Sequence, residues 1–235
     1  MNEMVITMDF GYIQKNFSEL SREIRELSDK YGREITLVSV TKSGSDEELC
    51  ALAAAGALDI GENRPGELRR RGDLLKERGY TPALHEIGNL QRNKVKLIIE
   101  SVSLIHSLDN LALAKEIDKQ AERVGRTVPV LIEINSAREE QKDGVTPEAA
   151  EEFLKEVKKF PHLSVRGLMT MGPVFDDPEE IRPYFRLTRE LFVRLNETCG
   201  FEGEGILSMG MSDSYRVAIE EGSTLVRVGR RLFNK

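Results

Sequence analysis

Residues 35–42 read ITLVSVTK, a mostly apolar run that ends in a lysine, and the small polar stretch SGS follows at residues 43–45. A run so rich in β-branched residues predicts a strand that is buried on both faces of a parallel sheet. Lys42 would then lie at the carboxyl end of this strand, at the rim of a dry interior. Because burial disfavours a charged ammonium, we expect Lys42 to be a neutral amine that can attack a carbonyl group.

Seven further β-rich runs follow the first, and polar sequence with helical periodicity separates them. They are residues 58–62, 83–88, 103–108, 128–135, 163–170, 205–211 and 223–228. Eight strands that alternate with helices match a (β/α)8 barrel better than a doubly wound sheet, since no G-x-G-x-x-G pattern follows the first strand. We therefore predict an α/β fold, a TIM barrel that forms a single domain over residues 1–235.

An extra amphipathic helix is predicted before the first strand. Its apolar residues are spaced alternately four and three apart, which places them on one stripe. They are Ile13, Phe17, Leu20, Ile24, Leu27 and Tyr31. Further along the chain, Ser45 and Glu48 predict a capping box, and Pro147 and Pro178 each predict a proline just inside a helix start.

The composition is that of a soluble globular protein, with 40% hydrophobic and 31% charged residues. A net charge of -6 argues against a surface for polyanions, so we predict no nucleic-acid partner. Cys50 and Cys199 form neither a disulfide framework nor a metal-ligand spacing. Residues 1–9 lack the pattern of a secretory leader, and no stretch reaches the ~20 apolar residues of a membrane span. We predict a cytoplasmic protein with no membrane partner.

Residues able to bind a ligand collect at the carboxyl ends of the predicted strands, where a barrel carries its active site. They are Lys42, Glu62, Asn63, Gly88, Asn89, Ser107, Asp109, Asn135, Met169, Thr170, Ser208, Gly210, Arg227 and Gly229. His85 and His106 end neighbouring strands, but no H-x-H or H-E-x-x-H spacing occurs. We therefore predict no metal site, and we interpret both histidines as hydrogen-bonded structural residues or as neighbours of a cofactor.

The last two predicted strands end in an anion-binding pattern. SMGMS at residues 208–212 runs into a helix start that Ser212 can cap, and RVGRR at residues 227–231 runs into another. Phosphate sites in barrels commonly follow strands seven and eight. A reactive lysine at one rim and a phosphate site opposite predict a pyridoxal phosphate pocket, in which the aldehyde meets Lys42. The phosphate would meet Ser208, Ser212, Gly229 and the amide of Arg230.

Arg227 lies inside an apolar strand, where an unpaired guanidinium would be costly. We expect its acceptor to be the pyridine nitrogen of the cofactor. Because arginine stays charged and only donates hydrogen bonds, it would keep this nitrogen unprotonated. The ring would then be a weaker electron sink than one that is paired with an acidic residue.

With these motifs the chain resembles the YggS/PROSC family, the pyridoxal phosphate homeostasis proteins, over nearly its whole length. The motifs are VSVTK at residues 38–42, GEN at 61–63, HEIGNLQRNK at 85–94, IHSLD at 105–109, GLMTM at 167–171, LSMGMSD at 207–213 and EEGSTLVRVG at 220–229. The resemblance implies the barrel of the alanine racemase amino-terminal domain. It also implies that Lys42 carries the cofactor as an internal aldimine and that Arg227 meets the ring nitrogen. The other cofactor contacts that we predict are Asn63, His85, Ser208, Met209, Ser212, Gly229 and Arg230.

Four positions depart from the family pattern. Arg64 and Glu86 each replace an aromatic residue, and Ser43-Gly44 lacks the proline often found after the lysine. Arg230 replaces a threonine, which removes a hydroxyl expected at the phosphate but leaves the backbone N–H.

The resemblance implies a carrier of pyridoxal phosphate that takes part in its homeostasis and lacks robust catalytic turnover. Racemisation needs acid and base groups on opposite faces of the substrate carbon. In the racemases one of these groups comes from a separate carboxyl-terminal domain, whereas this sequence stops at Lys235. Tyr215 is a speculative second base. The alternatives are a cofactor-dependent amino-acid racemase or lyase, and a cofactor-free Schiff-base aldolase.

Two charged runs have plain interpretations. Residues 138–143 read REEQKD, which predicts a solvated loop, although its position after the fifth strand leaves room for a lid. Residues 69–71 are three arginines, which we assign to an exposed helix face. As partners we predict enzymes that accept pyridoxal phosphate, and we expect the protein to be a monomer.

Overall fold

The computed structural model describes residues 10–139 and 141–235. The strands are β1 (Thr36–Val40), β2 (Asp59–Glu62), β3 (Ala83–Glu86), β4 (Leu104–Leu108), β5 (Val128–Glu133), β6 (Leu163–Met169), β7 (Ile206–Ser208) and β8 (Leu225–Val228). Each strand pairs in parallel with the next, and β8 pairs with β1 to close the barrel. Every observed strand lies within one of the predicted runs. The predicted (β/α)8 barrel is therefore confirmed.

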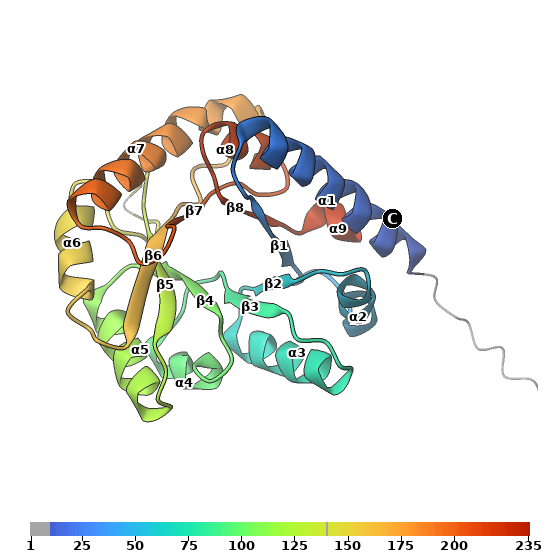
Figure 1. The fold of residues 1–235 in the computed structure, drawn as a ribbon, viewed down its shortest axis with the longest axis horizontal. Coiled ribbons are helices and arrows are strands. Elements are labelled where there is room, and N and C mark those ends of the chain that lie inside the picture. The colour runs from blue at the N-terminus through green and yellow to red at the C-terminus, as the bar shows by residue number, and fades with distance from the viewer. Residues whose placement is uncertain (1–9, 140) are drawn as a thin grey trace, which may run out of the picture.

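Helices surround the barrel, as Figure 1 shows. They are α1 (Gly11–Tyr31), α2 (Asp46–Ala54), α3 (Pro65–Glu77), η1 (Arg92–Lys94), α4 (Val95–Ile98), α5 (Leu111–Arg123), α6 (Ala150–Val157), η2 (Pro178–Ile181), α7 (Arg182–Thr198), α8 (Tyr215–Glu220) and α9 (Arg230–Phe233). None of them is long and apolar enough to span a membrane. Residues 1–9, where we predicted no secretory leader, lie outside the described residues.

The extra helix α1 is confirmed, and it packs against α9, the last helix of the chain. Ile13, Leu20 and Ile24 of its apolar stripe are buried in the core. The Asn16 amide donates to the carbonyl groups of Leu232 and Asn234 at 3.2 and 2.8 Å. Helix α1 therefore lies beside α9 near the end of the chain, although more than 200 residues separate the two in sequence (Figure 1).

The helix signals are partly confirmed. The capping box at Ser45 is present, and Pro178 starts η2 behind the N-cap Asp177. Pro147 lies in a turn, because α6 begins only at Ala150. The cap expected from Ser212 is wrong, because α8 begins at Tyr215 and its N-cap is Ser214.

The core has two layers that the barrel wall separates. The larger layer lies between the strands and the helices. The smaller layer consists of Val38, Leu104, Leu131, Met169 and Leu225. These five residues come from β1, β4, β5, β6 and β8. Since these strands are not all neighbours, their side chains can meet only inside the barrel. Alternation along a strand then directs residues two positions further on, such as Arg227 after Leu225, into the same interior.

Candidate active site at the barrel mouth

A cavity of about 440 Å³ opens at the carboxyl ends of the strands. We call it the Lys42 cavity. Its walls come from the segments that follow β1, β2, β3, β6, β7 and β8. This volume lies within the range of about 300–1,000 Å³ that small-molecule sites occupy. Of the predicted cofactor contacts, the cavity brings together Lys42, Asn63, Ser212, Arg227, Gly229 and Arg230.

Lys42 lies in a turn just beyond the end of β1. The strand ends at Val40, and the N–H of Gly44 donates to the carbonyl of Thr41 at 2.9 Å to close the turn. The Lys42 side chain lines the cavity but is exposed. The expected burial of this amine is therefore wrong, because the turn lifts residue 42 above the strand ends that form the dry interior.

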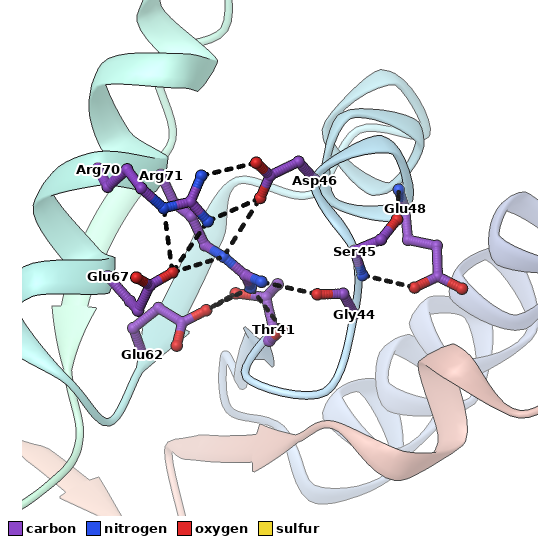
Figure 2. Close-up of polar contacts among 9 residues, drawn as sticks. All are labelled: Thr41, Gly44, Ser45, Asp46, Glu48, Glu62, Glu67, Arg70 and Arg71. Atoms are coloured by element: carbon purple, nitrogen blue, oxygen red, sulfur yellow. Dashed lines mark hydrogen bonds and ion pairs between the residues drawn. The ribbon is translucent and has the colours of Figure 1, made fainter.

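The turn that carries Lys42 is held from behind by Arg71 of α3 (Figure 2). The Arg71 guanidinium donates to the carbonyl groups of Thr41 at 2.5 Å and Gly44 at 2.6 Å. These carbonyls flank Lys42 and Ser43, so Arg71 binds both ends of the turn. The position of Lys42 thus depends on the backbone contacts of its turn, while its side chain is exposed.

Arg71 is itself paired inside the molecule. It donates to Glu62 Oε1 at 2.6 Å, and the Thr41 hydroxyl donates to the same oxygen at 2.5 Å. Arg71 is only 7% exposed, so its assignment to an exposed helix face is wrong. Leu68 and Leu75 are buried on the same helix, three positions before and four after Arg71. This spacing was the sequence signal that Arg71 faces inward.

The neighbouring arginine behaves as predicted. Arg70 is exposed and pairs with Asp46 at the start of α2 and with Glu67 one turn earlier on α3 (Figure 2). Asp46 is the first helical residue after the N-cap Ser45, within the capping box that Ser45 forms with Glu48. The Lys42 turn therefore runs from a strand end directly into a well-capped helix.

Arg227 lies on the cavity floor and is 3% exposed. Its guanidinium donates to the carbonyls of Ser208 and Thr170, each at 3.1 Å, and to the hydroxyl of Ser208. It also lies 3.4 Å from the sulfur of Met171. Burial lowers the pKa of Arg227 to about 10, and the charge of Glu133 partly opposes this shift. Arg227 remains a cation at neutral pH.

The segments after β7 and β8 meet at the cavity wall. The N–H of Gly229 donates to the Ser212 hydroxyl at 3.3 Å, so two groups predicted to hold phosphate contact each other. A Cβ atom at Gly229 would lie 2.9 Å from the carbonyl oxygen of Val40, so only glycine allows β8 to approach β1 this closely. Arg230 is exposed and pairs with Asp213.

Lys42 and the predicted phosphate-binding turns are neighbours. Since β8 pairs with β1, Val38 and Arg227 are partners in register. The expected placement across the barrel is therefore wrong. Barrel closure sets the first and last strands side by side, which sequence order does not reveal.

Three predicted cofactor contacts do not line the cavity. Met209 is fully buried in the layer between strands and helices. Its neighbour Ser208 points the opposite way, into the barrel below the cavity, where it contacts Arg227 and His106. His85 also lies in the interior, and its ring contacts His106 and Asp59. Strand alternation sets the direction of each side chain, and these directions lead away from the cavity wall.

Tyr215, the speculative second base, also lies elsewhere. It is 2% exposed, and its hydroxyl contacts Glu23 of α1 at 2.6 Å and Arg231. Burial and Glu23 raise the pKa of Tyr215 to about 12. Tyr215 ties α8 to α1 and does not face the cavity.

A second cavity of about 380 Å³ adjoins the first, with Ile87, Gly88, Met171, Val174 and Met211 in both walls. We call it the Glu133 cavity. Burial and the charges of Asp109 and Asp143 raise the pKa of Glu133 to about 7. Residues 141–143 of the predicted solvated loop line this cavity, and Asn89 donates to Asp143 at 2.8 Å. The loop therefore has one face on the site, although residue 140 lies outside the described residues.

The residues of the Lys42 cavity favour one kind of ligand. Lys42 supplies a primary amine and the buried Arg227 adds positive charge, while Asp213 in the same wall offsets the charge of Arg230. A small anion with a carbonyl group suits such a site. In pyridoxal phosphate the aldehyde and the phosphate arm are on adjacent ring carbons, which fits the neighbouring positions of Lys42 and the Ser212–Gly229 contact. The side chains present therefore fit this cofactor.

Comparisons with known proteins agree with this geometry. A family model described as alanine racemase, N-terminal domain, matches residues 16–234. The pyridoxal phosphate homeostasis protein of Aquifex aeolicus is 38% identical over 224 residues, which cover 94% of this chain and 97% of that protein.

Two solved structures are similar along the whole barrel. An unknown protein from Bifidobacterium adolescentis has a TM-score of 0.88 and 32% identity, over 99% of this chain and 98% of that one. PipY of Synechococcus elongatus with pyridoxal phosphate bound has a TM-score of 0.82 and 26% identity, over 94% of this chain and 100% of that one. The chain belongs to the pyridoxal phosphate homeostasis protein family, which the motifs around Lys42 and Arg227 had indicated.

Proposed function

We propose that this protein binds pyridoxal phosphate in the Lys42 cavity, holds it covalently through Lys42 and takes part in its homeostasis as a cytoplasmic carrier. The observation that carries the proposal is the shared cavity of a primary amine, Lys42, and a buried cation, Arg227. PipY, a relative with the same fold, is known with pyridoxal phosphate bound.

Each side chain has a part in this proposal. Lys42 Nζ supplies the amine that condenses with the aldehyde, with loss of one water molecule. Arg227 donates toward the ring nitrogen and, as a permanent cation, keeps it unprotonated. Ser212, Gly229 and the Arg230 amide hold the phosphate once the Ser212–Gly229 contact opens. Bound in this way, the cofactor would supply an electrophilic carbon that another amine can attack, which returns Lys42 as the free amine.

Borohydride reduction of the protein with bound cofactor, followed by peptide mass mapping, tests the covalent link. We expect the added mass on a peptide that contains Lys42, and we expect Lys42→Ala to lose both this mass and the visible absorbance. Because Lys42 is exposed, Lys42→Ala should unfold at the same temperature as the wild type. Added mass on another lysine would refute the assignment. A wild-type protein that takes up no pyridoxal phosphate would favour the cofactor-free aldolase.

One observation favours an enzyme that uses the same cofactor, a racemase or lyase. Glu133 is an acid or base with a pKa of about 7 beside the Lys42 cavity. Such a pKa suits proton transfer at neutral pH. Saturable turnover of an amino acid that both Lys42→Ala and Glu133→Gln abolish would establish this alternative. Absence of turnover in the wild-type protein would instead support the carrier function.

We further propose that the protein is a monomer and transfers its cofactor to enzymes that lack it. Light scattering after size exclusion should give a mass near 26.5 kDa. Loaded wild-type protein should activate a cofactor-free enzyme faster than the same concentration of reduced, covalently fixed protein does. Equal rates would argue against transfer.

A further inference from the structure

A line of hydrogen bonds crosses the barrel interior below the Lys42 cavity. Asp59 Oδ1 lies 2.9 Å from His85 Nε2, and His85 Nδ1 lies 3.0 Å from His106 Nε2. His106 Nδ1 lies 3.1 Å from the Ser208 hydroxyl, which accepts from Arg227. Asp59 begins β2, so the line runs from the amino-terminal end of the barrel to the cavity floor.

The middle of this line of hydrogen bonds is buried. His85 is 4% exposed, and His106 and Ser208 are fully buried. Only Asp59, whose side chain is 24% exposed, meets solvent. Burial, His85 and Arg227 together lower the pKa of His106 well below its ordinary value, so this ring is neutral and carries one hydrogen. The charged groups along the line are Asp59 at one end and Arg227, with Glu133 facing it, at the other.

With one hydrogen on each ring, the hydrogen bonds can run in two directions. A His85 ring with hydrogen on both nitrogens would make His106 donate from Nδ1, as in the second of these directions. In the first, Ser208 donates to His106 Nδ1, His106 Nε2 donates to His85 Nδ1, and His85 Nε2 donates to Asp59. In the second, the histidine hydrogens move to the Nδ1 atoms, and His106 donates to a Ser208 oxygen that already accepts from Arg227. The second direction leaves a bare His85 nitrogen 2.9 Å from a carboxylate oxygen, two acceptors with no hydrogen between them. Asp59 therefore selects the first direction.

We propose that Asp59, acting through His85 and His106, directs the Ser208 hydroxyl hydrogen toward His106, which leaves both lone pairs of that oxygen for Arg227 and so helps to position the guanidinium on the cavity floor. All four are positioning residues, because none of them lines the cavity. Only the meaning of Arg227 as a cofactor contact rests on the proposed function. The direction of the hydrogen bonds is a property of the protein without ligand.

Histidine NMR of the ¹⁵N-labelled protein without ligand tests the direction. The chain has three histidines, so the signals can be assigned by single substitutions. We expect His85 and His106 to carry hydrogen on Nε2 only. Hydrogen on Nδ1 of His106 would overturn the proposal, and this result needs no variant that might misfold.

A double-mutant cycle tests the coupling to Arg227. Asp59→Ala removes the acceptor that excludes the second direction, so we expect both directions to be populated, with hydrogen on Nδ1 of His106 in part of the molecules, and a Kd for pyridoxal phosphate higher by up to about 10-fold, equivalent to one hydrogen bond. In the Ser208→Ala background the same substitution should no longer change the Kd. An Asp59→Ala effect of equal size in both backgrounds would refute coupling through Ser208.

The third histidine provides the control. His162 Nδ1 lies 3.2 Å from Asp118 Oδ1, and this pair is partly exposed on the outside of the barrel. Asp118→Ala removes the same kind of contact and should change neither the His106 signals nor the Kd. An Asp59→Ala protein that matches Asp118→Ala in both measurements would refute the proposal. If the wild type binds no pyridoxal phosphate, the proposed function fails, while the NMR result still decides the direction.

Discussion

Lys42 and Arg227 line the same cavity, but the structure holds them in different ways. Lys42 is exposed, and only the backbone of its turn is held, by Arg71 behind it. Arg227 is buried, and its own side chain is held by Ser208 and Thr170. The covalent bond that we propose for Lys42 needs an accessible amine, which a fixed turn can present. The ligand contact that we propose for Arg227 needs a fixed direction, which buried hydrogen bonds provide.

Removing Arg71 should have the largest effect on the Lys42 side. Arg71→Met leaves Glu62 buried without its cation, so we expect the free energy of unfolding in urea to fall by about 3–5 kcal/mol. Glu62→Gln in the same protein should recover most of this loss. Arg70→Met is the matched control, and because its ion pairs are exposed it should cost less than about 1 kcal/mol. Equal decreases in the free energy of unfolding for both arginine variants would mean that the buried contacts of Arg71 do not hold the Lys42 turn.

Glu86 tests what the Arg71 cation does for Glu62. Glu86 is the register partner of Glu62 on β3, and within the described residues no arginine or lysine pairs with it. Its Oε1 accepts from the N–H of Gly88 at 3.1 Å, and its buried Oε2 has no hydrogen-bond partner within the described part of the chain. Burial, with a smaller contribution from Glu62, raises the pKa of Glu86 to about 8 from an ordinary value of 4.5. Glu86 is therefore mostly a neutral acid at neutral pH.

The raised pKa makes stability depend on pH. Between pH 4.5 and about 8 the unfolded chain releases this proton while the folded protein keeps it, so the free energy of unfolding falls as pH rises through this window. We expect Glu86→Gln to make this slope shallower, with the share of Glu133 remaining, and to be more stable than wild type at pH 8, by up to about 4 kcal/mol. Urea unfolding at pH 5 and pH 8 measures both effects. The exposed Glu180→Gln should keep the wild-type slope, and a slope as steep in Glu86→Gln as in the wild type would place the proton elsewhere.

Arg230, which follows the end of β8, should give the smallest effect on stability. Its exposed pair with Asp213 contributes little, so we expect Arg230→Thr to change the free energy of unfolding by less than about 0.5 kcal/mol. The added hydroxyl should lower the Kd for pyridoxal phosphate by about tenfold at most. A higher Kd would show that the Arg230 guanidinium itself holds the phosphate. Asp213→Asn, which frees that guanidinium, is the companion variant.

The fold was predictable because its signals are local. A short apolar run predicts each strand, and the spacing of Ile13, Leu20 and Ile24 predicts α1. These patterns follow from the geometry of single elements, with a period of two or of 3.6 residues. Pro147 and Ser212 were misplaced because helix starts depend on how the preceding loop packs, which a cap residue alone does not specify.

The candidate site was predictable only in outline. Lys42 and Arg227 stand out because each places a charge at the end of an apolar run. Arg71 was missed because it belongs to three consecutive arginines, and the charge pattern concealed its place on a buried stripe. Ser208 was expected at the phosphate and Met209 elsewhere on the cofactor, but adjacent strand residues face opposite ways, so both could not face the cavity wall.

By itself the sequence determined the alternation of strands and helices, the motifs of the family, and the residue types from which we propose an amine and an anion site. Tertiary structure alone decided that β8 lies beside β1, that Arg71 is buried against Glu62 while Arg70 is exposed, and that Lys42 is above the dry interior. The physical reason is that local geometry depends on neighbouring residues. Burial and pairing of a charge depend on partners that only chain closure brings within contact.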